Sequence, residues 1–296
     1  MRFGVLGTGY WAQEVHAAAL AAHPGAELVG VWGRDLAKAK AAGARFEVPG
    51  YADLDALLAD VGAVSISVPP SVQVGLAERA AAAGKHLLLE KPTGLSVAEA
   101  DRVVTAVRGA GVAAVVFFTF RFQQATDTWL AQAGRSRLAG GAGSWLGSLA
   151  GSPFGNSTWR MERGALWDIG PHALSLLLPA LGPVATVQAG AGLGDTVHLV
   201  LHHESGAAST LTLSQTVAPM AGGVEFFVHG DAGRVVLLPP IDQAVPSFQS
   251  AVDELSAAVT TGGIPACDVV FARDVVAVLA AVQRALDSGC REPVGG

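Results

Sequence analysis

The chain has 296 residues, of which 51% are hydrophobic, and its formal net charge is −6. That length suits one large domain or two of ordinary size, with enough apolar residues for a sizeable core. Only four residues are lysine and no basic run occurs, so the composition argues against a nucleic-acid partner.

The sequence predicts neither a membrane segment nor an oxidising compartment. Glycine, proline or charge interrupts every apolar run before about 18 residues, so no transmembrane helix is expected. Gly7, Gly9 and Glu14 break the apolar start too early for a signal peptide. The cysteines, Cys267 and Cys290, match neither a disulfide framework nor a zinc site. We therefore expect a cytoplasmic protein with no membrane partner and no metal site.

The N-terminal residues predict a nucleotide-binding loop. An apolar strand at 3–6 runs into Gly7-Thr8-Gly9-Tyr10-Trp11-Ala12, and an alanine-rich helix follows to about Ala22. Gly7 permits a tight turn, Gly9 lets the backbone approach a pyrophosphate, and Ala12 allows close packing of helix on strand. The helix N-terminus would then face the anion. A turn without a ligand is the alternative, but the flanking strand and helix favour cofactor binding by these six residues.

The residues at the end of the predicted second strand, 27–32, indicate which cofactor the protein prefers. NAD-binding proteins usually carry an acidic residue there for the ribose hydroxyls. This chain has Gly33-Arg34, and Asp35 comes two positions late, where it is expected to cap the helix 36–43. An arginine without an acid suits a 2′-phosphate, so we expect NADP to be preferred, with NAD possible. A solvated arginine on a loop is the alternative.

Strand and helix patterns alternate through the first 118 residues. Further helices are predicted at 54–58, at 74–83, and from a capping box at Ser96–Glu99 to about Gly109. Further strands are predicted at 63–68, 85–89 and 112–118. Such alternation is typical of a doubly wound parallel sheet. We therefore predict an α/β fold, with an NAD(P)-binding Rossmann domain over 1–118.

Glu90-Lys91-Pro92 follows the strand predicted at 85–89, at the edge of a parallel sheet where ligands bind. Pro92 disfavours the helical region for Lys91 and would hold its ammonium in one direction. Lys91 could then serve as a general acid or as an electrostatic anchor. The alternative is an ordinary ion pair of Glu90 at a strand end, with Lys91 solvated.

Beyond Thr119 the pattern changes to alternating strands joined by glycine turns. Strands are predicted at 184–187, 197–201, 209–213, 225–228 and 235–237, and helices at 247–261 and 268–288. We assign 119–296 to a substrate-binding and oligomerisation domain of α+β type with an open, mainly antiparallel sheet. The glycine-rich segment 139–151 is predicted to be a flexible loop.

The predicted helices of this domain suffice to cover only one face of its sheet. We expect the other face to carry valine, leucine and phenylalanine at alternate positions and to pair with a second copy of the chain. The sequence therefore predicts a homo-oligomer.

A second candidate for acid/base chemistry lies in Asp168-Ile169-Gly170-Pro171-His172. Pro171 suits the first turn of a helix reaching about Leu181. The helix dipole disfavours the protonated form of a histidine on that turn, which suits a neutral acid/base. Asp168 is near enough in sequence to orient His172 or to share a proton with it. In the alternative, Asp168 caps the helix and His172 packs in the core.

Together these segments resemble the glucose–fructose oxidoreductase/inositol dehydrogenase (Gfo/Idh/MocA) family. The shared segments run along most of the chain: the Gly7–Ala12 loop, Glu90-Lys91-Pro92, Phe118–Phe122, Trp159-Arg160 and Asp168–His172. The resemblance implies a Rossmann domain followed by an open-sheet domain, with the site between them. It also implies that Lys91, Asp168 and His172 surround the substrate carbinol opposite the nicotinamide.

Three features depart from the family pattern. Gln73 stands where the family often has histidine, the second strand lacks its terminal acid, and the chain is shorter than many members. Pro69, Gln73 and Glu90 are still expected on the cofactor side.

The resemblance implies an NAD(P)-dependent dehydrogenase or reductase that interconverts a secondary alcohol and a ketone on a polyol, sugar or related compound. Lys91 would polarise the oxygen and His172 would act as acid/base, although the two roles could be reversed. Arg121, Trp159 and Arg160 are expected to line the substrate pocket. The alternative is a regulatory or scaffold protein that senses a nucleotide on the same fold without turnover.

Overall fold

The computed structural model describes residues 1–237 and 244–295. Their contacts form two compact units, one of residues 1–122 with 244–273 and one of residues 123–237 with 274–295. The predicted second domain, 119–296, includes 244–273, which the contacts group with the first unit. The predicted boundary at 118/119 stays a prediction, and residues 238–243 and 296 lie outside the described residues.

The first unit is built on a six-stranded parallel sheet in the order β3-β2-β1-β4-β5-β6. Its strands are β1 (Arg2–Leu6), β2 (Glu27–Trp32), β3 (Gly50–Tyr51), β4 (Ala63–Ile66), β5 (His86–Glu90) and β6 (Ala114–Phe117). The central strands β4 and β5 are buried on both faces over most of their length, as is typical of parallel sheets. The predicted doubly wound fold is confirmed.

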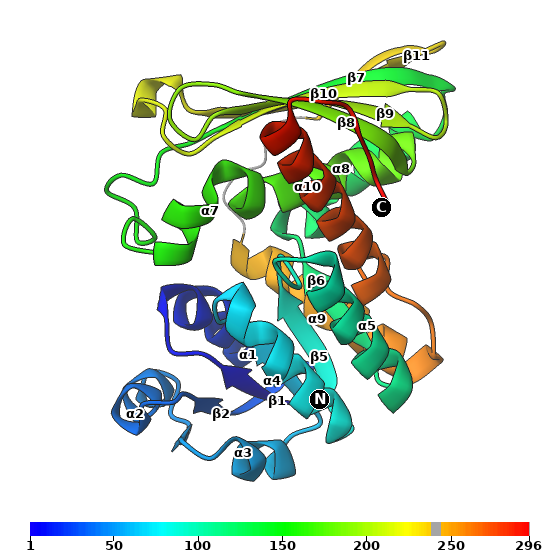
Figure 1. Ribbon diagram of the computed structural model, residues 1–296. Helices are drawn as coiled ribbons and strands as arrows, with labels where there is room; N and C mark the ends of the chain where they lie inside the picture. Colours follow the sequence, from blue (N-terminus) through cyan, green and yellow to red (C-terminus); the bar gives the residue numbers. More distant parts are fainter. Residues whose placement is uncertain (238–243, 296) are drawn as a thin grey trace. The chain divides into compact units, whose positions relative to one another are not determined.

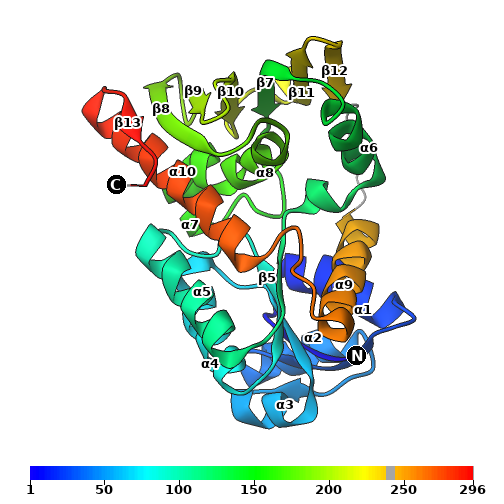
Figure 2. The same ribbon diagram turned by 90° about the vertical axis from the view of Figure 1, so that its right-hand side faces the viewer.

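Helices cover both faces of this sheet. They are η1 (Ala12–Ala17, a π-helix), α1 (Ala18–Ala22), α2 (Leu36–Ala44), α3 (Leu54–Asp60), α4 (Pro70–Ala82), α5 (Val97–Ala110), the 3₁₀ turn η2 (Thr119–Phe122) and α9 (Ala244–Thr261). Figure 1 and Figure 2 show α4 next to α5, and Figure 2 shows α1 and α9 on the opposite side of β5.

Helix caps in this unit follow the sequence pattern with one difference. Asp35 Oδ1 accepts the N–H groups of Ala37 and Lys38, so this residue caps α2 as predicted. Ser96 Oγ accepts the N–H of Glu99, but the Glu99 carboxylate accepts from Leu95 N–H at 2.6 Å, one residue before the cap. The helix predicted at 74–83 begins earlier, at Pro70, because proline suits a first helical turn.

The second unit is built on a seven-stranded mixed sheet in the order β12-β11-β7-β10-β9-β8-β13. Its strands are β7 (Leu138–Leu146), β8 (Val184–Ala191), β9 (Val197–His203), β10 (Ala208–Ser214), β11 (Gly223–Gly230), β12 (Gly233–Leu237) and β13 (Glu292–Pro293). All neighbours are antiparallel except β7 and β10, which run parallel. The predicted open, mainly antiparallel sheet is confirmed.

The prediction of a flexible loop at 139–151 is wrong for most of the segment, because β7 is an interior strand between β11 and β10. The glycines of β7 leave room for neighbouring groups that a side chain would displace. A Cβ on Gly143 would collide with the Phe226 ring, and one on Gly141 would lie 2.7 Å from the carbonyl oxygen of Phe227. Glycine in a strand often marks such a close approach, which local composition does not distinguish from a loop.

Helices of this unit lie on one side of its sheet. They are α6 (Gln124–Ala133), α8 (Gly170–Leu181) and the part of α10 (Val269–Ser288) that belongs to this unit; α7 (Thr158–Asp168) precedes α8, and η3 (Pro219–Ala221) is a short 3₁₀ turn. In the described parts of the chain, no helix is both long and apolar enough to cross a membrane.

The expectation of an apolar outer sheet face is wrong in large part. The large apolar side chains are buried on the face towards the helices: Leu199, Leu201, Leu211, Leu213 and Phe226. Because side chains alternate along a strand, their neighbours His198, Thr210 and Glu225 point outward and are exposed. Val200, Phe227 and Val236 are the more apolar members of that outer face.

Candidate functional site

Gly7 makes the turn that follows β1. Its φ of 141° lies in a region that other residues rarely adopt, and its N–H donates to the Trp32 carbonyl at 3.0 Å. A Cβ on Gly7 would collide with the Ser67 carbonyl oxygen and would lie 3.4 Å from Ala12 Cβ. Ala12 is itself buried, so the small side chains at both positions let the first helix pack closely on the strand.

Gly9 has a different surrounding. Apart from its two chain neighbours, no atom of residues 1–237 and 244–295 lies within 4 Å of the place where its Cβ would be, so packing does not demand glycine there. Gln13 secures the loop, because its backbone N–H donates to Gly9 O at 3.2 Å and its Nε2 to Thr8 O at 2.9 Å. The open space beside a helix N-terminus fits the pyrophosphate of a dinucleotide. Tyr10, at the same turn, is 49% exposed.

The end of β2 lies against this loop. A Cβ on Gly33 would lie 2.7 Å from Thr8 Cγ2, so two of the residues predicted to bind the cofactor are neighbours. Asp35 is occupied by its cap, and Arg34 is exposed. Arg34 is therefore an exposed cation directly after the strand, whereas the Asp35 carboxylate is engaged through Oδ1 in the cap of α2.

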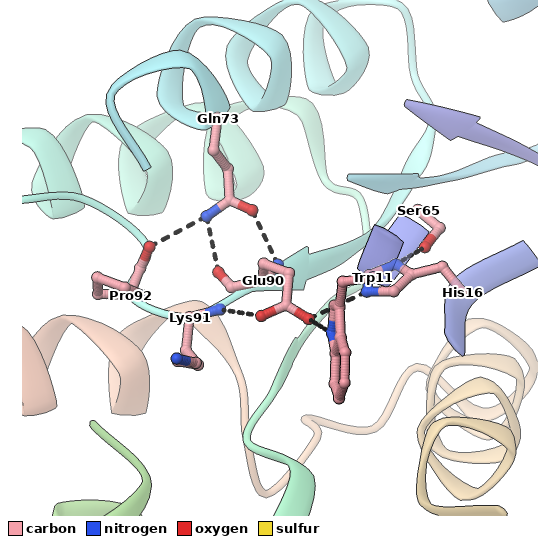
Figure 3. A network of polar contacts seen from close by, with 7 residues as sticks. All are labelled: Trp11, His16, Ser65, Gln73, Glu90, Lys91 and Pro92. Atoms are coloured by element: carbon pink, nitrogen blue, oxygen red, sulfur yellow. Dashed lines mark hydrogen bonds and ion pairs between the residues drawn. The ribbon is translucent and has the colours of Figure 1, made fainter. Parts of the chain in front are cut away.

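The Glu90 carboxylate joins the first helix to the Lys91 turn, as Figure 3 shows. Its Oε1 accepts from Trp11 Nε1 at 2.7 Å and lies 3.0 Å from His16 Nε2, while its Oε2 accepts the Lys91 N–H at 3.2 Å. Lys91 is 8% exposed, and its peptide bond to Pro92 is cis. The predicted alternative of a solvated Lys91 is therefore wrong.

His16 is a residue of this network that the sequence motifs did not reveal. It follows Trp11 by five positions, and the π-helical turn η1, with its i→i+5 hydrogen bonds, lets both side chains reach one oxygen. Its Nδ1 lies 2.6 Å from Ser65 Oγ on β4. A carboxylate only accepts, so Nε2 carries a proton, and in the neutral ring Ser65 then donates to Nδ1.

Gln73 holds the end of β5, as Figure 3 shows. Its Oε1 accepts the Glu90 N–H at 2.8 Å, and its Nε2 donates to the carbonyls of Glu90 at 2.7 Å and Pro92 at 3.1 Å. The Gln73 side chain is buried, and these backbone contacts supply the hydrogen-bond partners that a buried polar group needs. Pro69 is exposed at the start of α4. A cofactor contact by either residue stays a prediction.

Asp168 and His172 lie four residues apart along nearly continuous helical backbone, so they share one face. The alternative that Asp168 caps α8 is wrong, because Ile169 holds the cap position without a side-chain hydrogen bond. The Asp168 Oδ2 atom accepts from Arg160 Nε at 2.9 Å and from Gln215 Nε2 at 2.6 Å. Asp168 and His172 are 5% and 8% exposed.

Aromatic rings line this part of the second unit. The His172 ring stacks on Trp145, with centroids 5.5 Å apart and 27° between the planes. The Arg160 guanidinium lies over the rings of Phe154 at 4.4 Å and Trp159 at 4.8 Å from their centroids. The predicted substrate residues Trp159 and Arg160 therefore cluster with Asp168.

Arg121 belongs to the first unit and lies beside the buried thiol of Cys267. Burial raises the pKa of this thiol to about 12, although the Arg121 guanidinium acts in the opposite direction. The thiol is therefore protonated at neutral pH and unsuited to nucleophilic chemistry. A substrate contact by Arg121 stays a prediction.

Two further residues of the second unit were not found from the sequence. Gln215 contacts Asp168, and no motif surrounds it. Asp195 Oδ2 accepts the Ala165 N–H at 3.0 Å, next to Gly164, where φ of 62° and ψ of −167° interrupt α7. That backbone conformation is almost exclusive to glycine, so the glycine before Ala165 was the only local signal.

Comparison with known proteins assigns both parts of the chain. The family described as "Oxidoreductase family, NAD-binding Rossmann fold" matches residues 1–118, and the "GFO/IDH/MocA C-terminal domain" matches residues 143–236. A UDP-N-acetylglucosamine 3-dehydrogenase from Acidithiobacillus ferrooxidans is 39% identical over 104 residues, which are 35% of this chain and 32% of that protein.

A dTDP-3,4-didehydro-2,6-dideoxy-alpha-D-glucose 3-reductase from Streptomyces antibioticus is 33% identical over 198 residues, covering 62% of this chain and 57% of that protein. The chain thus spans less than two thirds of the length of either relative. The crystal structure of a probable dehydrogenase from Thermotoga maritima shares the fold, with a TM-score of 0.89, 20% identity and 99% coverage of both chains.

Alanine at Gly7 and at Gly9 should separate folding from cofactor binding. Gly7→Ala should lower the free energy of unfolding by about 1–3 kcal/mol, because its φ is strained for alanine and its Cβ meets Ser67. Gly9→Ala should change it by less than about 0.5 kcal/mol. NADPH should nevertheless bind Gly9→Ala roughly tenfold more weakly, because the methyl group occupies the open space at the loop. Urea denaturation and fluorescence titration measure the two quantities; unchanged NADPH affinity in Gly9→Ala would show that this space is not used.

Proposed function

The chain belongs to the GFO/IDH/MocA oxidoreductase family, and from this premise we propose that it is an NAD(P)-dependent dehydrogenase or reductase. It interconverts a secondary alcohol and a ketone on a sugar, a polyol or a related hydroxylated compound. The observation that carries the proposal is the Glu90 carboxylate, which connects the helix of the glycine loop to the Lys91 turn. A nucleotide cradle and a candidate catalytic cation thus belong to one hydrogen-bonded assembly.

The residues of the glycine loop fit the cofactor. The backbone from Gly7 to Ala12 would hold the pyrophosphate, and Gly33 and Arg34 would meet the adenosine ribose. When bound, the nicotinamide supplies the hydride acceptor or donor. Because Arg34 is a cation with no competing carboxylate, we propose a preference for NADP over NAD.

Two groups are assigned to the transfer of charge and protons. Lys91 is held at the end of β5 and supplies the positive charge that stabilises an alkoxide oxygen. His172 takes or returns the proton. Arg160 and Gln215 both donate to Asp168 Oδ2, and we assign to Asp168 the role of orienting the neighbouring histidine. The roles of Lys91 and His172 could be exchanged.

The substrate class is inferred from relatives. The two curated relatives described above are named for reactions at position 3 of nucleotide-linked hexoses. Their names support a hydroxylated ring as the substrate of this chain. No comparison supports the alternative of a regulatory or scaffold protein without turnover. Cytoplasmic location and the lack of a nucleic-acid partner stay predictions.

The cofactor preference can be tested at Arg34. NADPH should bind roughly tenfold more tightly than NADH, a difference of about 1.4 kcal/mol. Arg34→Ala should remove most of this difference by weakening NADPH alone. Arg108→Ala, the same substitution at an exposed position of α5, should leave both affinities unchanged. Calorimetry showing that the unmodified protein prefers NADH would reject the proposal. Arg34 is a cleaner test than Gly33→Asp, whose Cβ would press on Thr8.

The chemistry can be tested with variants in both units. Lys91→Ala and His172→Ala should each lower kcat by roughly 10²- to 10⁴-fold, while the cofactor Kd changes little. Lys91→Met, which keeps the apolar stem, should be as inactive as Lys91→Ala but closer to normal in stability. Asp168→Asn should lower kcat by a smaller factor than these substitutions if the role of Asp168 is orientation. Steady-state kinetics with a panel of sugars and polyols provides kcat; a near-normal value for Lys91→Met would remove Lys91 from the mechanism.

We also propose a homo-oligomer formed through the outer face of the sheet in the second unit. Val200, Phe227 and Val236 lie on this face, and Val236 is 49% exposed. Val200→Glu should reduce the mass measured by light scattering at micromolar concentration, because the charge would be buried on association. Met220→Glu, at the fully exposed Met220 of η3, should not. A monomeric mass for the unmodified protein would contradict this proposal.

A further inference from the structure

Gln215 directly follows β10 and reaches the candidate catalytic residues of the second unit. Its side chain is buried, with 7% exposure. Its Nε2 donates to Asp168 Oδ2 at 2.6 Å, and its backbone N–H donates to Asp195 Oδ1 at 2.9 Å. The backbone of Gln215 is therefore held by one carboxylate and its side chain by another.

The orientation of the Gln215 amide follows from its neighbours. Asp168 Oδ2 also accepts from Arg160 Nε at 2.9 Å, so the carboxylate acts as an acceptor towards both residues. An amide oxygen turned towards this carboxylate would face a second acceptor. The amide nitrogen must therefore point at Asp168, which leaves Oε1 on the other arm.

Gln215 Oε1 has no hydrogen-bond donor within residues 1–237 and 244–295. Buried side-chain oxygens almost always have a partner, and an unsatisfied one destabilises the folded protein. This oxygen belongs to the amide that holds Asp168, and Asp168 shares a helix face with His172. An acceptor without a donor thus belongs to the amide that contacts Asp168, the residue assigned to orient His172.

We infer that Gln215 Oε1 accepts a hydrogen bond from a substrate hydroxyl or N–H group next to the carbon that is oxidised. This inference rests on the proposed function and adds a specificity-determining residue to it. The amide nitrogen of Gln215 orients Asp168, and the amide oxygen selects the substrate. A substrate analogue that lacks the donor leaves the buried oxygen unsatisfied, and sites of this kind discriminate strongly against such analogues.

The first test is structural and needs no turnover. Crystals of the unmodified protein would be soaked in glycerol, the smallest polyol with adjacent hydroxyls. We expect a glycerol hydroxyl or an ordered water at roughly 3 Å from Oε1, with Nε2 still on Asp168. A protein donor at Oε1, a reversed amide, or an oxygen that meets no donor would overturn the inference whether or not the protein is an enzyme.

The second test is kinetic and uses D-glucose with its 2-, 3- and 4-deoxy analogues as probes. In the unmodified protein, kcat/KM should fall by roughly tenfold or more for the analogue that lacks the contacted hydroxyl. In Gln215→Leu the ratio of kcat/KM for D-glucose to kcat/KM for that analogue should approach one. Gln188→Leu, the same change at an exposed position of β8, should preserve the ratio of the unmodified protein. An unchanged ratio in Gln215→Leu would assign that residue to the support of Asp168 alone.

Failure of the inference on Gln215 can be distinguished from failure of the proposed function. If the unmodified protein oxidises no sugar or polyol, the proposed function fails, and the glycerol-soaked crystal still decides whether Oε1 is a ligand-facing acceptor. Melting temperatures of both leucine variants separate a lost contact from a lost fold.

Discussion

A single carboxylate organises the first unit at the carboxyl edge of its sheet. Glu90 accepts from an indole and an imidazole on η1 and from the backbone N–H of the residue that follows it. Hydrogen bonds to a charged acceptor are stronger than neutral ones, and the Glu90 side chain is only 13% exposed. Without this carboxylate, Trp11 and His16 would lose a shared acceptor, and the glycine loop would lose this hydrogen-bonded connection to the turn that carries Lys91.

Gln73 supports the same turn from α4, and its chemistry explains why glutamine is suited to this position. The side chain makes three hydrogen bonds, two as donor and one as acceptor, all to the backbone around Lys91. A neutral imidazole has one donor and one acceptor and could not make all three. Glutamine at this position therefore makes more hydrogen bonds to the backbone of the turn than a neutral histidine could.

The second unit uses the same principle with a different carboxylate. Asp168 is buried and receives donors from Arg160 on its own helix and from Gln215 beyond β10. A buried carboxylate requires such donors, because an unpaired charge would be costly. In both units, residues proposed to do chemistry stand on helices or strand ends, and polar side chains from elsewhere restrict them, which is how a site is preorganised.

The sequence by itself predicted the alternation of strands and helices over 1–118, a mainly antiparallel sheet after it and the glycine loop, and it singled out Lys91, Asp168 and His172. These follow from local patterns: periodicity, caps and turn residues act over a few neighbours. The tertiary structure alone decided that Glu90 meets Trp11 and His16, 79 and 74 positions away, and that Gln215 meets Asp168 across 47 positions. It also made 138–146 a strand, because the rings and backbone that need its glycines lie on β11 and β10. Such contacts depend on how strands register and layers pack, and no local pattern records that arrangement.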